Sequence, residues 1–215
     1  MKNALTLVIG DKNLSSWSMR PWLVLKVSGL SFGEVLVRLD TDKTAAKIKK
    51  FSPSGGVPVL KHGNLTIWDS LAISEYIAEL VPERNLWPVS STDRALARAV
   101  TAEMHAGFSS LRAQLSMDIR LRTEVRYLSA QTIAEIERVI QLWSSALRRS
   151  SGGFLFGDFG IADAFYAPVV MRFNSYGIKL KDPKLQNYVQ RVCDHSATKE
   201  WVAAALKEKP AKMSF

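Results

Sequence analysis

The pattern of apolar and polar positions changes partway along the chain. Up to about residue 80, short apolar runs typical of strands alternate with segments of helical spacing. The expected elements are a strand over 4–9, a helix over 17–27, a strand over 34–39, a helix over 43–50, strands over 57–61 and 65–68, and a helix over 70–80. The first strand–helix–strand unit implies parallel pairing, and the turn at 62–64 implies a hairpin, so the sheet should be mixed.

The second part of the chain has a different pattern. Pro82 and Pro88 interrupt the helical spacing, and strand signals are absent after them. Helical spacing continues to the end, with helices expected over 92–116, 132–148, 161–173, 185–192 and 199–206. These patterns predict an α/β domain over residues 1–81, a linker over 82–90 and an all-α helical bundle over 91–215.

Composition narrows the class of protein. The 215 residues are 47% hydrophobic, enough for packed cores, and contain no apolar run of about 18 residues that would predict a membrane span. The first apolar stretch is too short for a signal peptide. The single cysteine, Cys193, forms no intrachain disulfide, which suits a reducing, cytoplasmic location. Three scattered histidines without ligand spacing predict no metal site.

The formal charge of +9 should attract anions. Nucleic-acid binding, an anionic small substrate and simple solvation of helix faces all agree with it. Because no block of five or more basic residues occurs, solvated faces are favoured over nucleic acid.

A serine pair stands where the first strand meets the first helix. Ser15 and Ser16 lie at a junction where free backbone N–H groups and the helix dipole stabilise an anion. A serine hydroxyl there can donate to a bound thiolate, which lowers the pKa of the thiol. An ordinary helix N-cap is the alternative.

A Val57-Pro58 pair precedes the third strand. Proline cannot donate to a sheet ladder, and a cis bond at this position would turn the backbone of Val57 outward. An extended peptide could then pair with that backbone, as an added strand does. The alternative is an ordinary Gly-Gly turn before an edge strand.

Asp69-Ser70 opens the next helix. Ser70 at the helix N-terminus would hold a carboxylate, and the Asp69 side chain would hold an ammonium group. An α-amino-acid head carries both charges. A capping pair without a ligand is the alternative.

The order and spacing of these three segments resemble the glutathione transferase family over nearly the whole chain. The resemblance implies a thioredoxin-like first domain that binds glutathione, a helical second domain, and a cleft between them for a small hydrophobic electrophile. It places Ser15 at the thiolate-activating position of serine-type members, with Ser16 as its substitute. It assigns glutathione binding to Val57, Pro58, Asp69 and Ser70, and it implies a cytoplasmic homodimer.

The resemblance leaves several points open. It suggests an electrophile pocket at Trp17, Met104, His105 and Phe108, although core packing explains the last three equally well.

In the second domain, Gly160 lacks a side-chain oxygen, so Asp163 should cap its helix by accepting backbone N–H groups.

Two other functions remain as alternatives. Residues 14–16 resemble the Ser-Ser-Cys run of maleylacetoacetate-isomerase-like members, but Trp17 replaces the cysteine. A non-catalytic binding module of the same fold is the second alternative.

Overall fold

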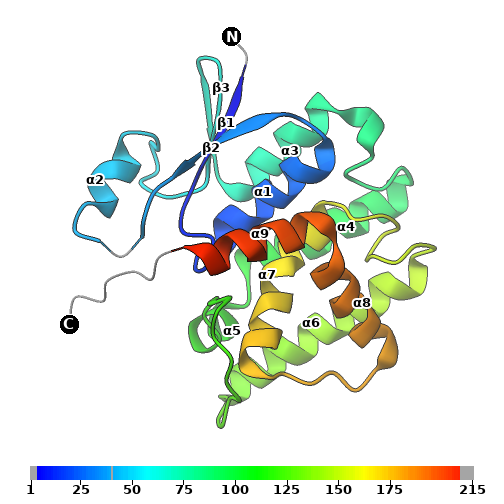
Figure 1. The fold of residues 1–215 in the computed structure, drawn as a ribbon. Coiled ribbons are helices and arrows are strands. Elements are labelled where there is room, and N and C mark those ends of the chain that lie inside the picture. The colour runs from blue at the N-terminus through cyan, green and yellow to red at the C-terminus, as the bar shows by residue number, and fades with distance from the viewer. Residues whose placement is uncertain (1–3, 40, 209–215) are drawn as a thin grey trace.

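The computed structural model describes residues 4–39 and 41–208. The first part contains the strands and three helices, and the second part is helical (Figure 1). The elements of the first part are β1 (Leu5–Ile9), α1 (Ser16–Ser28), β2 (Phe32–Leu36), α2 (Thr44–Lys49), β3 (Val59–His62), β4 (Leu65–Trp68) and α3 (Ser70–Leu80). Those of the second are a short 3₁₀ helix (Pro82–Arg84), α4 (Ser91–Ala106), α5 (Ser109–Gln114), α6 (Ala130–Arg149), α7 (Ile161–Tyr176), α8 (Pro183–Asp194) and α9 (Ser196–Lys207).

The sheet is mixed, as the sequence predicted. Its strand order is β2-β1-β3-β4, with β1 parallel to β2 and the other two pairs antiparallel. The β3–β4 turn contains Gly63, whose φ of 57° lies in the left-handed region. Strand β2 ends earlier than predicted, because its neighbour β1 ends at Ile9 and the last bond of the pair runs from Val37 N to Ile9 O at 2.8 Å.

Alternate residues of β1 face two cores. Val8 packs with Ile48 of α2 in a small cluster on one side of the sheet. Leu7 and Ile9 belong to the main core on the other side, which α1 and α3 cover (Figure 1). Helix α1 ends at Gly29, with φ 78°, the predicted C-cap.

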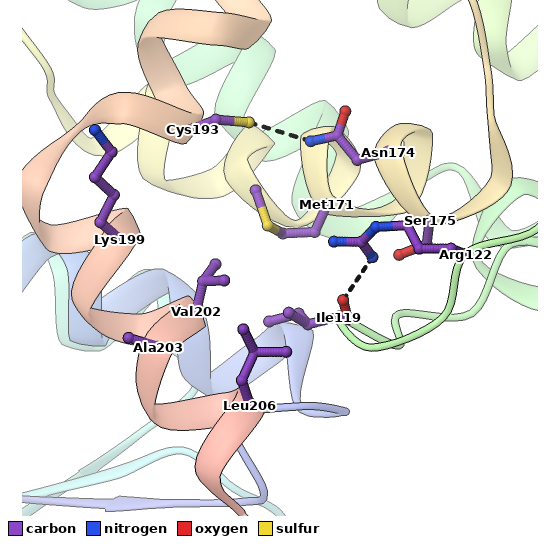
Figure 2. A pocket seen from close by; sticks show the side chains of 10 residues that line it. All are labelled: Ile119, Arg122, Met171, Asn174, Ser175, Cys193, Lys199, Val202, Ala203 and Leu206. Atoms are coloured by element: carbon purple, nitrogen blue, oxygen red, sulfur yellow. Dashed lines mark hydrogen bonds between the residues drawn. The ribbon is translucent and has the colours of Figure 1, made fainter.

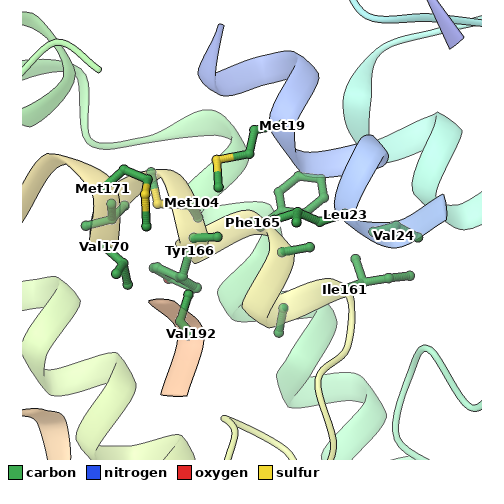
Figure 3. Packing of buried hydrophobic residues seen from close by; sticks show 14 of the residues in the cluster. Met19, Leu23, Val24, Met104, Ile161, Phe165, Tyr166, Val170, Met171 and Val192 are labelled. Carbon is green, nitrogen blue, oxygen red and sulfur yellow. The ribbon is translucent and has the colours of Figure 1, made fainter. Parts of the chain in front are cut away.

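One hydrophobic core joins the two parts of the chain. Met19 and Leu23 of α1 face Phe165 of α7, and Met104 of α4 lies beside them (Figure 3). Nearly every residue of α7 is buried, as its apolar run predicted. The α1–α7 contact therefore fixes the α/β part against the helical part.

The helix expected over 92–116 is wrong as a single helix. Ser90 caps α4, its Oγ accepting from Asp93 N at 3.3 Å, and α4 ends at Ala106. Phe108 then takes a left-handed φ of 61°, and α5 begins after it. A Cβ at Gly107 would come within 2.9 Å of the Glu103 carbonyl oxygen, so this sharp change of direction requires the glycine.

Candidate functional site

Ser15 is the N-cap of α1. Its oxygen accepts from Ser18 N at 3.3 Å, and its hydroxyl donates to Ser18 Oγ at 2.8 Å. Ser18 Oγ also accepts from Gly10 N at 3.0 Å, which ties the helix start to the end of β1. The capping alternative is therefore present, and a ligand would take the hydroxyl hydrogen from Ser18 without removing the cap.

Ser16 has a different environment. Its oxygen accepts from Arg172 Nη2 of α7 at 3.2 Å. Within the described residues no acceptor takes the hydroxyl hydrogen of Ser16. Both serines are buried. That one of them donates a hydrogen bond to a bound thiolate stays a prediction.

A cavity of about 310 Å³ brings together parts of all three segments singled out in the sequence. Trp17 comes from the first, Val57 and Pro58 from the second, and Asp69 and Ser70 from the third. The Val57–Pro58 peptide is cis, as predicted. The remaining lining residues are Ser54, Gly56 and Trp68. Ser15 and Ser16 precede Trp17 but do not line this cavity.

Asp69 is the N-cap of α3 in a rare backbone conformation. Its φ of 76° and ψ of 137° cost a non-glycine residue of the order of 1–3 kcal/mol. Residues with such a strained backbone cluster at functional sites. One carboxylate oxygen accepts from Leu71 N at 2.7 Å, and the other lies 3.2 Å from His105 Nε2. The next hydroxyl, Ser70 Oγ, is buried and has no hydrogen-bond partner among the described residues.

Trp17 lines this cavity, and His105, which does not line it, contacts both Trp17 and Asp69. The Trp17 and His105 rings meet edge to face with centroids 5.3 Å apart. Burial lowers the pKa of His105, and the nearby Asp69 carboxylate opposes this effect. Met104 and Phe108 are buried in the main core and do not line the cavity. Of the four candidates for the electrophile pocket, only Trp17 lines this cavity, and His105 contacts Trp17.

Two arginines, Arg20 and Arg112, pack on Trp17, and a third, Arg172, contacts the neighbouring Ser16; the sequence pattern had singled out none of the three. The guanidinium carbon of Arg20 lies 4.3 Å from the Trp17 ring centroid, and that of Arg112 lies 4.8 Å from it. Burial, followed by the charges of Arg112 and Arg172, lowers the pKa of Arg20. The available signal was a charged residue inside an apolar helical run, at Arg20 in the first helix and Arg172 in the 161–173 segment.

A second cavity, of about 300 Å³, lies among α7, α8 and α9 (Figure 2). Met171, Val202 and Leu206 give it an apolar wall. Asn174 Nδ2 donates to Cys193 Sγ at 3.1 Å, and burial raises the pKa of the Cys193 thiol. A thiol with a raised pKa is a poor nucleophile at neutral pH, so this cavity lacks an activated group.

Two searches bear on other kinds of site. No group of three or more His, Cys, Asp or Glu side chains within residues 4–39 and 41–208 is placed to hold a metal ion. No helix in the described part of the chain is both long and apolar enough to cross a bilayer.

Comparisons with known proteins match both parts of the chain. Residues 14–80 match the family model for the glutathione S-transferase N-terminal domain, and residues 94–191 match that for the C-terminal domain. Glutathione S-transferase 1 of Dianthus caryophyllus is 29% identical over 182 residues, covering 79% of each chain. A probable maleylacetoacetate isomerase of Caenorhabditis elegans is 26% identical over 170 residues, covering 77% of this chain and 78% of that protein.

A solved structure shows the same arrangement. A glutathione transferase homologue from Burkholderia GL BGR1, crystallised with bound glutathione, superimposes with a TM-score of 0.71 at 27% identity. The match covers 96% of this chain and 99% of that one.

Proposed function

We propose that this chain, which belongs to the glutathione S-transferase family, binds glutathione in the cavity lined by Trp17, Val57, Asp69 and Ser70. Bound there, the thiol of glutathione loses its proton to solvent, and the thiolate attacks a small hydrophobic electrophile. The observation that carries this proposal is the buried Ser70 hydroxyl, which stands at the N-terminus of α3 in the cavity wall and has no hydrogen-bond partner within residues 4–39 and 41–208.

The γ-glutamyl end of glutathione fits this corner of the cavity. Its α-carboxylate would accept from the Ser70 hydroxyl and backbone N–H, where the dipole of the 11-residue helix α3 favours a negative charge. Its ammonium group would pair with the Asp69 carboxylate, which the unusual backbone of that residue holds at the cavity. The glutathione backbone would run along residues 56–58 and add to the sheet as a strand does.

Ser15 would then stabilise the thiolate. Its hydroxyl hydrogen, now donated to Ser18 Oγ, would turn to the sulfur, while its oxygen continues to cap α1. Bonding the charged form of the thiol lowers its pKa, and the N-terminus of α1 adds to the effect. Ser16 is the other candidate, since Arg172 holds its oxygen and leaves its hydrogen free within the described residues.

The test combines calorimetry with ultraviolet absorbance. Glutathione is titrated into the wild type, Ser15→Ala and Ser16→Ala, and the thiolate absorbance of each complex is followed against pH. We expect the wild type to lower the pKa of the thiol by about one unit or more, equivalent to about 1.4 kcal/mol. The substitution that abolishes this shift while glutathione still binds identifies the donor. Absence of glutathione binding by the wild type would leave a non-catalytic module as the better interpretation.

A glutathione-dependent isomerase is the second candidate. The similarity to the probable maleylacetoacetate isomerase of Caenorhabditis elegans favours it, together with the Ser15-Ser16 pair. The two activities differ in the fate of glutathione: a transferase consumes it in a conjugate, whereas an isomerase releases it unchanged. Measuring free thiol during turnover of maleylacetoacetate therefore separates them.

We also propose a cytoplasmic homodimer. Strand β4 lies at the edge of the sheet, and its Leu65 and Trp68 are 47% and 46% exposed. Exposed apolar side chains on an edge strand favour association with another surface. Sedimentation velocity of the wild type and Leu65→Lys tests this, because the charged variant should shift toward monomer if β4 lies in the interface.

A further inference from the structure

We propose that the electrophile taken by this enzyme carries an anionic group, such as the carboxylate of an aromatic acid, and that Arg20 and Arg112 bind that group beside Trp17. The inference rests on the proposed function, since it names the class of the second substrate. It goes beyond a purely hydrophobic electrophile.

Arg20 is a buried cation whose hydrogen bonds are incomplete. Its side chain is 1% exposed, and neither Nε nor Nη1 has a hydrogen-bond partner among the described residues. It packs on the faces of Trp17 and Phe165, with its guanidinium carbon 4.3 and 4.9 Å from the two ring centroids. Aromatic faces stabilise a cation but do not satisfy N–H donors, and desolvating an ion costs several kcal/mol. An anion bound here would complete the missing bonds.

Arg112 approaches the same indole ring from α5. It donates through Nη2 to the carbonyl oxygens of Met104 and His105 at the end of α4, and these bonds hold the guanidinium in place. Its Nε is buried without a partner in the described part of the chain. Arg20 and Arg112 thus share contact with Trp17, and each keeps unused donors.

The neighbouring carboxylates offset only part of the positive charge: Asp69 opposes the lowering of the pKa of Arg20, and Glu135 opposes that of Arg112. Asp69 is engaged by the start of α3 and by His105, and Glu135 accepts from Leu111 N at 2.7 Å. Arg172 adds a third positive charge, and each of its three nitrogens already donates a hydrogen bond, to Leu115 O, Pro168 O and Ser16 Oγ. Three guanidinium groups against two carboxylates leave the cluster with an excess of positive charge. The buried nitrogens of this cluster that have no hydrogen-bond partner among the described residues are Arg20 Nε, Arg20 Nη1 and Arg112 Nε.

The cluster lies next to the proposed glutathione site through Trp17, which also lines that cavity. An aromatic carboxylate bound there would place its ring by Trp17 and its charge on the guanidinium donors that pack on this residue. Guanidinium groups bind carboxylates through paired N–H donors, which gives this choice of anion a geometric basis.

The experiment compares two electrophiles with the same leaving group. One is a chloronitrobenzene, and the other is a chloronitrobenzoate. In both reactions the glutathione sulfur forms a C–S bond, and chloride leaves with the electrons of the C–Cl bond. Steady-state kcat/KM is measured for each at saturating glutathione and divided by the uncatalysed rate constant, which removes the intrinsic effect of the carboxylate on reactivity.

We expect the corrected preference of the wild type for the benzoate to fall by about tenfold or more in Arg112→Gln, as loss of a charged hydrogen bond requires. Arg112→Lys, which keeps the charge without the planar group, should retain part of the preference. Arg148→Gln is the matched control, because Arg148 is exposed in the last turn of α6 and the same charge is lost. An unchanged preference in Arg112→Gln would overturn the inference and leave the transferase proposal intact.

A binding measurement separates this inference from the proposed function. Nitrobenzoate and nitrobenzene are titrated calorimetrically into wild type, Arg112→Gln and Arg112→Lys without glutathione, after circular dichroism has confirmed the fold. Saturable nitrobenzoate binding that weakens about tenfold in Arg112→Gln supports the anion site even if the chain conjugates neither electrophile. No nitrobenzoate binding, or equal binding to wild type and both variants, refutes it.

Discussion

Replacing Ser70 by alanine should move stability and glutathione affinity in opposite directions. Ser70 is 1% exposed, and its Oγ has no partner among the described residues. A buried hydroxyl without a hydrogen bond costs about 1–3 kcal/mol, so the ligand-free protein should gain stability or keep it when the hydroxyl is removed. A hydrogen bond to a carboxylate is worth about 1.5–3 kcal/mol, so the dissociation constant for glutathione should rise about 10- to 100-fold.

The assay pairs urea unfolding of the ligand-free protein with glutathione calorimetry. Ser74→Ala is the matched control on the same helix, since the Ser74 hydroxyl is also buried but already donates to Ser70 O at 2.8 Å. That variant should change the free energy of unfolding by no more than about 1 kcal/mol and should bind glutathione like the wild type. If Ser70→Ala retained full affinity, or lost stability in step with affinity, the hydroxyl would be a structural group and the reasoning would fail.

Three further predictions concern the two helix starts. Asp69→Asn keeps an oxygen for the cap of α3 but loses the charge, so the unfolding midpoint should change little. Glutathione should bind about tenfold more weakly in calorimetry. Equal affinity would refute the pairing of the glutathione ammonium group with Asp69. Burial raises the pKa of Asp163 from 3.8 to about 6. The protonated carboxyl therefore contributes to the free energy of unfolding at low pH, and this contribution is lost as the pH rises through 6. The stability difference between wild type and Asp163→Asn should therefore shrink by about 2 kcal/mol between pH 4 and 7, and a difference that grows would contradict it. Gly160→Ala should lower the free energy of unfolding in urea by about 1–3 kcal/mol, because the new Cβ would come within 2.8 Å of Leu86 O. An unchanged unfolding midpoint would show that the backbone at Leu86 moves to accommodate the methyl group.

Local chemistry made much of the fold predictable from the sequence. Gly29 ends α1 and Asp163 caps α7, accepting from Leu155 N and Gly160 N at 3.0 Å each, because these devices depend on residues close together in the chain. The mixed sheet followed from the spacing of strand and helix signals. The proline before β3 carried the cis bond that its position suggested. The family resemblance placed Val57, Asp69 and Ser70 together, and they share one cavity in the structure.

The break between α4 and α5 was not predictable in the same way. The helical spacing of apolar positions continues across Gly107 and Phe108. The chain nevertheless turns there, because Phe108 packs in the main core with a left-handed φ. A single glycine within a helical pattern does not by itself predict such a turn.

The sequence alone determined the order of strands and helices up to α3 and local devices such as the Gly29 C-cap and the Asp163 cap, since these follow from bonds and steric limits within a few positions. Only the tertiary structure decided that Arg20, Arg112 and Arg172 meet around the start of α1, because they come from three helices far apart in the chain. Tertiary packing also placed Met104 in the core and His105, its neighbour, against Asp69. The rotation of each helix depends on how its surface packs against the others, and that packing involves the whole chain at once.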